Sequence, residues 1–393
     1  MIEFNDAPEK WRKSIADIEK EYGTEIRKAE LSEEISPVMV TVLKELGILS
    51  LMIPKELGGA SGDLKTYCLI LEELARISGS LSLLAHSQMS SSILLRLGED
   101  EAQTRKYLLR QLKDDRFIAA IGMTEPGAGS DISAMETRVT RHGDHYLLNG
   151  QKCFVSHGSL ADIFFVFAKP ESFQDIKDLL IFIVEKEMEG VKIERNETKL
   201  GMKGSPLSVV IFEDVKLTRD RLFAGGRNDG GRGFKKVMGG LNISRLGAGA
   251  VALGLAQAAI DGALGFIREG ESVKGPAEPA QSVQFILADG EAKVEAIRAL
   301  IYRTAGRIDR KEWNVIKAAS VAKYFATETA MQVASNTFQI FRTRGATGDY
   351  PIERILRDLT CTLILEGTSQ IHQTIIAREL MKSGDERTKG LQG

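Results

Sequence analysis

The sequence predicts an α+β protein of several domains, in which an antiparallel β domain stands between two helical regions. Apolar residues have helical spacing up to about residue 114, form short strand-like runs from about 117 to 221, and return to helical spacing from about 233. The 393 residues are enough for two or three domains with buried cores. The expected domains are an N-terminal helical domain over 1–118, a central antiparallel β domain over 119–228, a C-terminal four-helix-bundle domain over 229–383 and a flexible tail over 384–393.

Composition and charge indicate a globular protein of a reducing compartment. Hydrophobic residues make up 43% of the chain and the net charge is -2, so neither nucleic acid nor an anionic membrane is expected as a partner. The three cysteines lack the spacing of a metal site, and the five histidines are scattered. The start of the chain lacks the pattern of a signal peptide. We therefore expect a cytoplasmic protein without a metal centre.

The first region has the pattern of several helices. Leu43, Leu46 and Leu49 recur at helical spacing, and the apolar residues of 69–77 do the same. The glycines of 57–62 predict a loop between two of these helices.

The middle region has the pattern of strands joined by turns. A polar turn at 142–144 precedes an apolar run, which predicts a hairpin. Further apolar runs at 163–168, 179–184 and 209–212 are followed by charged residues. Because no helical pattern separates these runs, they favour an antiparallel sheet or a small barrel.

The last region predicts four long helices, which cover residues 234–269, 280–310, 315–341 and 352–381. The apolar stretch 246–260 is too short to span a bilayer. Its small residues, such as Gly249 and Gly254, would let another helix approach closely. We therefore expect a buried packing helix here, and no membrane span.

Glu366 is a candidate catalytic base within an interruption of the last helix. It follows the apolar run 363–365 and precedes Gly367. The pKa of an acidic side chain among apolar neighbours tends to rise, and such a carboxylate suits removal of a weakly acidic C–H proton. The alternative is a glutamate at a helix end that points into water.

Two further segments contain candidate residues of a ligand-binding site. The glycines of 122–131 would let backbone N–H groups approach a ligand, and Thr124 and Ser130 add hydroxyl groups. Phe154 and Ser156 are two positions apart and can face the same side of a strand. Alone, each segment is also explained by a tight turn or by ordinary sheet core.

Together and in this order, the motifs resemble those of the acyl-CoA dehydrogenase family. They are Met-Thr-Glu-Pro-Gly-Ala-Gly-Ser-Asp at 123–131, Asn-Gly-Gln-Lys at 149–152, Phe-Glu-Asp-Val at 212–215, Arg245, Tyr-Pro-Ile-Glu-Arg at 350–354 with Arg357 and Asp358, Glu-Gly-Thr-Ser-Gln-Ile at 366–371 and Ile-Ala-Arg at 376–378. The resemblance covers nearly the whole chain and includes the order of helices, sheet and helices.

The resemblance implies an FAD-dependent dehydrogenase that oxidises the Cα–Cβ bond of an acyl thioester such as an acyl-CoA. Members of the family hold FAD between the sheet domain and the C-terminal helices, usually as homotetramers. By resemblance, Glu366 removes the α-proton while a hydride leaves Cβ for the flavin. The backbone N–H of Glu366 and a ribityl hydroxyl would bind the thioester carbonyl, as an oxyanion hole does. An electron-transfer flavoprotein is the implied electron acceptor.

The resemblance also implies binding roles for matching positions. The residues that would bind FAD are Met123, Thr124, Ser130, Phe154, Ser156, Gln339, Arg342, Thr368 and Gln370. Those that would contact the acyl thioester are Ser130, Arg245, Leu365 and Gly367. Phe154 stands where the family commonly has tryptophan.

One departure from the family pattern concerns the end of FAD that carries the pyrophosphate. Gly270 and Val273 replace an arginine and a phenylalanine, and in the family that arginine reaches the pyrophosphate of a neighbouring subunit's FAD. Where the family has two consecutive glycines, this chain has Arg342 and Thr343, and Arg344 follows directly. Because a guanidinium binds pyrophosphate through paired donors, Arg342 or Arg344 is a candidate substitute. The alternative is a changed loop with weaker FAD binding.

A second departure lies toward the CoA end of the substrate. Pro206 and Leu207 replace hydroxyl residues near the pantetheine, and Asn242 replaces a frequent acidic residue. Besides an acyl-CoA dehydrogenase, the chain could therefore act on a thioester bound to an acyl carrier protein, or be a catalytically weak structural member. The presence of Glu366 and Thr368 argues against the last hypothesis.

Overall fold

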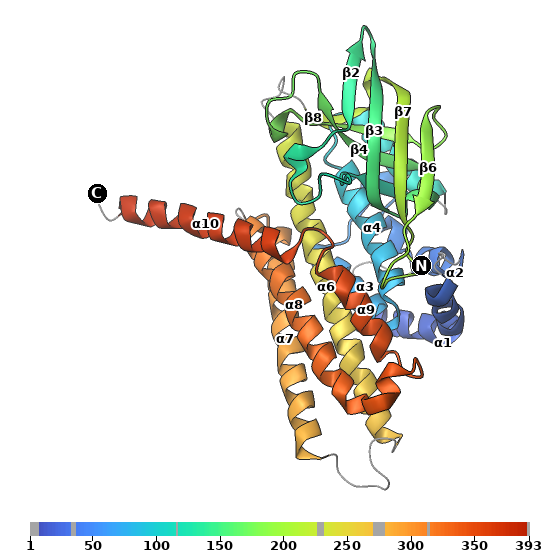
Figure 1. The fold of residues 1–393 in the computed structure, drawn as a ribbon, viewed down its shortest axis with the longest axis vertical. Helices are drawn as coiled ribbons and strands as arrows, with labels where there is room; N and C mark the ends of the chain where they lie inside the picture. Colours follow the sequence, from blue (N-terminus) through green and yellow to red (C-terminus); the bar gives the residue numbers. More distant parts are fainter. Residues whose placement is uncertain are drawn as a thin grey trace. The chain divides into compact units, whose positions relative to one another are not determined.

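The computed structural model describes residues 8–32, 37–114, 117–225, 232–269, 280–312 and 315–390, with only the backbone of residues 32 and 383–390. The chain forms two compact units. Figure 1 shows the described helices and strands, coloured along the sequence. The first unit contains residues 1–62, 84–199 and 203–241, and the second contains 63–83, 200–202 and 242–393, as far as these are described.

The N-terminal helices of the first unit confirm the helical pattern of that region. They are α1 (Pro8–Ser32), α2 (Pro37–Glu45), α5 (Glu101–Lys113) and, from residue 84 onward, α4 (Gly79–Leu95). Helix α1 buries the apolar side chains of Trp11, Ile15 and Ile18 along one face. Helix α5 begins at a cap, because the Asp100 carboxylate accepts a hydrogen bond from the backbone N–H of Gln103 (3.0 Å).

The sheet of the first unit has eight strands, which confirms the predicted β region. They are β1 (Ala119–Gly122), β2 (Arg138–His142), β3 (His145–Ser156), β4 (Ile163–Pro170), β5 (Leu180–Glu185), β6 (Val191–Asn196), β7 (Leu207–Thr218) and β8 (Leu222–Gly225). Their order is β6-β7-β3-β2-β4-β5-β8, with β1 paired to β4. The long strands β3 and β7 stand beside each other in Figure 1.

Most strand pairs are antiparallel, as predicted, but two are parallel. β2 and β3 form the expected hairpin around Gly143, whose φ of 61° is readily available to glycine. The exceptions are β1 with β4 and β2 with β4, which run parallel. The predicted antiparallel β domain is thus confirmed, and the two parallel pairings add to it strands that no hairpin connects.

The core of the first unit forms between this sheet and the helices α4 and α5. Phe165 of β4 and Ile181 of β5 are fully buried and belong to the same apolar cluster as Leu95 of α4 and Tyr107 of α5. Residues 163–168 are buried throughout, which explains why this strand reads as a continuous apolar run rather than an alternating one.

The second unit consists of helices, as predicted for the C-terminal region. They are α3 (Leu64–Ile77), most of α6 (Arg232–Arg268), α7 (Gln281–Asp309), α8 (Val315–Phe341), α9 (Ile352–Thr362) and α10 (Ser369–Gly390). The predicted helices match α6, α7 and α8 closely, and the predicted interruption separates α9 from α10. The expected tail 384–393 begins inside α10, and residues 391–393 lie outside the described residues.

Small residues of α6 allow close packing, as the sequence suggested. A β-carbon on Gly254 would lie only 2.1 Å from the carbonyl oxygen of Glu72 in α3, and one on Gly249 would lie 2.6 Å from Ile301 in α7. Helix α6 is long and apolar enough to cross a membrane by composition, but 67% of its most apolar window is buried inside the protein. This burial is that of a core helix.

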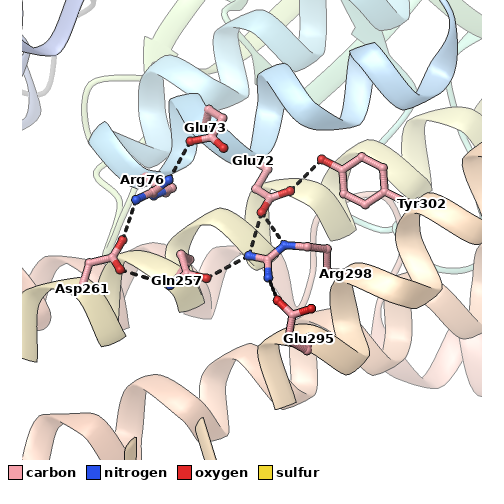
Figure 2. A network of polar contacts seen from close by, with 8 residues as sticks. All are labelled: Glu72, Glu73, Arg76, Gln257, Asp261, Glu295, Arg298 and Tyr302. Carbon is pink, nitrogen blue, oxygen red and sulfur yellow. Dashed lines mark hydrogen bonds and ion pairs between the residues drawn. The ribbon is translucent and has the colours of Figure 1, made fainter. Parts of the chain in front are cut away.

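A polar network fastens α3 to α6 and α7 (Figure 2). The buried carboxylate of Glu72 accepts hydrogen bonds from Nε of Arg298 (2.9 Å) and from the hydroxyl of Tyr302 (2.7 Å). On the neighbouring turn of α3, Arg76 forms an ion pair with Asp261 of α6 (2.9 Å). Because the buried Glu72 carboxylate is paired and hydrogen-bonded, the helices can bury it at a tolerable cost.

Candidate active site

Glu366 lies on a strained turn between α9 and α10 of the second unit. The N–H groups of Ile364 and Leu365 both bond to the carbonyl of Cys361 (3.2 and 3.1 Å), and the helix then ends. Glu366 has φ 57° and Gly367 has φ 101°. A left-handed conformation in a residue other than glycine costs about 1–3 kcal/mol and persists only where the surroundings impose it.

Lys323 of α8 holds this turn from one side. Its Nζ donates hydrogen bonds to the carbonyl oxygens of Leu363 (3.1 Å) and Gly367 (2.8 Å), which stand before and after Glu366 in the chain. The side chain is fully buried. Burial lowers the pKa of Lys323 to about 8, although the negative charges of Glu366 and Glu328 oppose this shift.

Two further side chains complete the surroundings of the turn. Arg245 of α6 donates from Nη1 to Asn242 (2.9 Å), and burial lowers its pKa although the charge of Glu366 raises it. His372 of α10 is fully buried, and a β-carbon on Gly367 would lie 3.3 Å from its Nε2. Burial, with the nearby charges of Lys323 and Arg245, lowers the pKa of His372 to about 4, so its ring is neutral at physiological pH.

The other predicted residues of the second unit fall into two groups. Leu365, Gly367, Thr368 and Gln370 lie in the turn or at the start of α10, next to Glu366. Thr368 also accepts a hydrogen bond from the N–H of Ile371 (3.4 Å), as a residue that caps α10.

Gln339 and Arg342 form the second group, at the C-terminal end of α8. Gln339 is sixteen residues beyond Lys323, which is about 24 Å along a helix. Both side chains are exposed, and Arg342 has φ 52°. The structure therefore separates them from the Glu366 turn. Gly270 and Val273, the other positions of that departure, lie outside the described residues.

The first unit gathers predicted residues where the loop after β1 meets β3. Met123 and Thr124 follow β1, and the carbonyl of Thr124 accepts a hydrogen bond from the N–H of Cys153 (2.9 Å). Next to Cys153, Phe154 has φ 53° at an irregularity of the β3–β7 pairing, and 57% of its surface is exposed. Ser156 is half-buried, two positions further along the same strand. Phe154 is thus not the sheet-core residue of the simpler interpretation.

A buried ion pair fixes the start of this loop. Nζ of Lys152, on β3, lies 2.7 Å from Oε1 of Glu125 and donates to the carbonyl of Met123 (3.2 Å). Burial alone would raise the pKa of Glu125, but hydrogen bonds from Lys152 and from the N–H of Thr137 and of Glu136 outweigh it and lower this pKa. Burial lowers the pKa of Lys152 to about 8, so the pair is charged at neutral pH.

The residues present in the first unit fit a flat aromatic cofactor. An exposed phenylalanine ring on a strand offers a stacking surface, and Thr124 and Ser156 add hydroxyl groups. A β-carbon on Gly127 or Gly129 would meet nothing within 4 Å, so the loop backbone is open there. Ser130, at the end of the same loop, is exposed. An isoalloxazine ring has the shape and the hydrogen-bonding edge that such a surface suits.

Sequence reasoning assigned no role to four of these residues: Lys323, His372, Lys152 and Glu125. One signal was available for Lys323. It recurs at helical spacing with the buried Ala319, Ala322 and Ala326, so its side chain had to be buried as well. Nothing in the sequence shows that its partners would be backbone carbonyls.

A sheet with helices before and after it in the chain, and a glutamate on a strained turn between C-terminal helices, are what the motifs led us to expect of an acyl thioester oxidoreductase. The chain belongs to the acyl-CoA dehydrogenase family. The N-terminal, middle and C-terminal domains of this family match residues 6–114, 120–215 and 231–381. The resemblance seen in the motifs is thereby confirmed, and with it the fold class and the assignment as a flavin-dependent family of oxidoreductases.

The names of two relatives describe them as reductases or reductase subunits. The chain is 37% identical to a 3-(aryl)acrylate reductase of Clostridium sporogenes, over 90% of this chain and 92% of the relative. It is 35% identical to subunit CarC of the caffeyl-CoA reductase-Etf complex of Acetobacterium woodii, over 93% of this chain and 95% of the relative.

Two solved structures are similar over almost their whole length. Butyryl-CoA dehydrogenase from Megasphaera elsdenii aligns with a TM-score of 0.87 and 29% identity, over 97% of this chain and 100% of that one. The prolyl acyl carrier protein oxidase AnaB aligns with a TM-score of 0.85 and 25% identity, over 96% of this chain and 99% of that one. Both CoA-linked and carrier-linked substrates therefore occur among similar proteins.

Proposed function

We propose that this protein oxidises the Cα–Cβ bond of an acyl-CoA, with Glu366 as the base that removes the α-proton. The strained turn carries this proposal, because Glu366 keeps a left-handed backbone conformation while buried groups of three helices bond to the turn, pack against it or act on the charge of Glu366. FAD, when bound, would accept the hydride that leaves Cβ. The alternative of a catalytically weak structural member does not explain why the turn is built at such a cost.

Each unit would contribute binding groups of its own. In the first unit, Thr124, Phe154 and Ser156 would contact the flavin ring, and the exposed Ser130 would contact ring or acyl thioester. In the second unit, Leu365, Gly367 and Arg245 would contact the acyl thioester. Met123, Thr368 and Gln370 would bind FAD through backbone or polar side-chain atoms.

Exchange of the substrate α-hydrogen with deuterated solvent tests the role of Glu366. We expect Glu366→Gln to retain FAD and to lose the exchange, because an amide cannot accept the proton. Glu291→Gln, an exposed position on α7, is the matched control and should exchange at the parent rate. Exchange at the parent rate in Glu366→Gln would place the base elsewhere.

The reverse reaction is a second candidate, because two relatives are named reductases. Mixing the oxidised protein with saturated thioesters gives the rate of flavin reduction, and mixing the reduced protein with unsaturated thioesters gives the rate of flavin reoxidation. Comparing the two rates would show the preferred direction. Faster reoxidation by an aryl-substituted unsaturated thioester would assign the chain to reduction. The same measurements with an acyl carrier protein thioester would test the carrier-bound alternative, which Pro206 and Leu207 and the similarity to AnaB motivate.

We propose further that Arg342 binds the pyrophosphate of FAD in place of the arginine that the family has at position 270. Arg342 is exposed and makes no hydrogen bond or ion pair among the described residues, so its guanidinium is available. Arg344 was the other candidate, but it already forms an ion pair with Asp349 (3.0 Å). Gln339, on the last turn of α8, would bind the adenine half of the cofactor of a neighbouring subunit.

Flavin retention after gel filtration distinguishes the two arginines. Arg342→Ala should lose FAD on dilution, whereas the matched variant Arg344→Ala should retain it as the parent does. If only Arg344→Ala loses FAD, then Arg344 and not Arg342 binds the pyrophosphate. Unchanged retention in both would favour a changed loop without a substitute cation.

We also propose a cytoplasmic homotetramer that exchanges electrons with an electron-transfer flavoprotein. The relative that is a subunit of a reductase-Etf complex supports this partner. Static light scattering would give the oligomeric state. Reduction of a purified electron-transfer flavoprotein, coupled to thioester oxidation, would test the partner, and direct reaction with oxygen at the same rate would contradict it.

A further inference from the structure

Lys323 occupies an unusual environment for a lysine. Its ammonium group is fully buried and its two hydrogen bonds are to backbone carbonyls, those of Leu363 and Gly367. It forms no ion pair with a carboxylate in the part of the chain that the structure describes. Buried charges in proteins are normally paired with an opposite charge at hydrogen-bonding distance, so this arrangement calls for an explanation.

Capping of a helix end explains only half of the arrangement. The last carbonyls of a helix lack partners within it, and a cation is favourable near that end. The bond to the carbonyl of Leu363, at the end of α9, fits this explanation. Gly367 lies beyond α9, so the bond to its carbonyl serves the turn and not the helix. Together the two bonds span the segment whose middle is Glu366.

His372 also lies against the turn. Its buried ring lies against Gly367, close enough that an added β-carbon would be 3.3 Å from Nε2. The turn is thus bonded to a lysine from α8 and packed against a histidine from α10. Neither residue has been given a role in the reaction, and both lie against the one turn that carries the proposed base.

We infer that Lys323 is a positioning residue for Glu366: its two hydrogen bonds hold the turn in the left-handed conformation, and its positive charge acts on the carboxylate. This inference rests on the proposed role of Glu366 as base. Lys323 has no proposed contact with substrate or cofactor. It acts through the turn.

Because the proposed role of Lys323 requires its positive charge, α-hydrogen exchange should depend on pH. The groups that act on it electrostatically are Glu366 on the turn, Glu328 on α8 and Arg245 on α6, and His372 lies beside it on α10. The pKa of Lys323 is lowered to about 8, so its charge is present at neutral pH and is lost above this value. We expect α-hydrogen exchange to fall on the alkaline side through a pH of about 8.

The test compares Lys323→Met with Lys317→Met in the FAD-loaded protein. Lys317 is a half-buried lysine of the same helix that makes no hydrogen bond among the described residues. In Lys323→Met we expect α-hydrogen exchange to fall roughly 10- to 100-fold, as misplacement of a catalytic group does, with thioester affinity changed much less. The decrease of α-hydrogen exchange above a pH of about 8 should also disappear. Lys317→Met should behave as the parent protein.

A second measurement reports the turn without reference to activity. Backbone amides of 363–368 should exchange with deuterium at least about tenfold faster in Lys323→Met, because the hydrogen bonds that hold the turn are gone. If this variant does not fold, Lys323→Gln replaces it: the amide keeps a donor but no charge. It should then retain part of the amide protection and lose the alkaline fall.

The outcomes separate this inference from the proposed function. If the parent exchanges the α-hydrogen and Glu366→Gln does not, the proposed base stands. If Lys323→Met or Lys323→Gln then exchanges at the parent rate, with the parent pH profile and unchanged amide protection, the positioning role is refuted. If Glu366→Gln still exchanges, the proposed function fails instead, whatever the lysine variants show.

Discussion

Replacing Lys152 by methionine should destabilise the first unit strongly, because it strands a buried carboxylate. Lys152 is fully buried, and its Nζ lies 2.7 Å from Glu125, which is 5% exposed. Removing one partner of a buried pair costs about 3–5 kcal/mol. The double variant Glu125→Gln, Lys152→Met strands no charge and should cost less than the single variant, about 1–3 kcal/mol, because the N–H groups of Glu136 and Thr137 donate to different carboxylate oxygens and the glutamine oxygen can accept only one of these bonds.

The loss of unfolding free energy caused by Lys152→Met should depend on pH, and the ionisation of Glu125 sets the direction of this dependence. In the parent, the pKa of Glu125 is lowered, so its contribution to stability is present at neutral pH and is lost as the pH falls through the folded pKa. Without Lys152, burial dominates and favours the protonated, neutral acid. The difference in unfolding free energy between parent and variant should therefore shrink below about pH 5.

Native-state hydrogen exchange of the β3 amides is the appropriate assay, because a chain with two units need not unfold in one step. The control is Lys169→Met, at the end of β4, where the ammonium lies over the ring of Phe173 (4.4 Å) and is only half-buried. Its cost should stay below about 1 kcal/mol. A cost for Lys152→Met as small as the control's, or a double variant as unstable as the single one, would refute the reasoning.

Two further predictions concern stability. His157 and His372 have pKa values lowered by burial to about 3 and about 4, so each is neutral in the folded protein while the unfolded chain takes up a proton below about pH 6.5. Each histidine should therefore lower the unfolding free energy of its own unit by about 1.4 kcal/mol per pH unit between pH 6 and 4.5, and replacing it by glutamine should remove this contribution, as native-state hydrogen exchange of that unit would show. Gly254→Ala should cost at least about 2 kcal/mol, since the new carbon would lie 2.1 Å from the carbonyl oxygen of Glu72. Gly265→Ala on the same helix meets nothing within 4 Å and should stabilise by about 0.5–1 kcal/mol in thermal unfolding; similar melting points for both would contradict the packing argument.

The helices of the second unit could be predicted closely because their signals are local. Apolar residues recur at helical spacing along α8 and not in the sequence before and after it, so the predicted range 315–341 is the observed one. The parallel pairing of β2 with β4 could not be predicted in this way. It depends on which strands meet across the sheet, and residues 138–142 contain no sign of their second neighbour.

The division into units also depends on contacts distant in sequence. Helix α3 belongs to the second unit, where Glu72 and Arg76 join it to α6 and α7. From the sequence, α3 was placed with the other N-terminal helices, because nothing local distinguishes it from them. A buried glutamate in an apolar helix was the one available hint that a cation would come from elsewhere in the chain.

In the candidate site, motifs indicated which residues matter but not how the backbone carries them. Glu366 and Phe154 were selected for their chemistry, and both adopt positive φ, a feature that no composition or spacing predicts for glutamate or phenylalanine. Motif resemblance transfers the identity of a residue. The conformation has to come from its neighbours, and those neighbours, Lys323 and Lys152, were not recognised.

The cost of the Glu366 turn is itself an argument for function. The left-handed conformation costs about 1–3 kcal/mol. Keeping Lys323 charged costs about 3 kcal/mol more, since its pKa falls from 10.5 to about 8. An apolar residue at 323 and a glycine at 366 would avoid both costs. A turn that served only to connect two helices would not need a buried cation next to a carboxylate on strained backbone. A reaction that requires an ionised base at a fixed position explains why both are present.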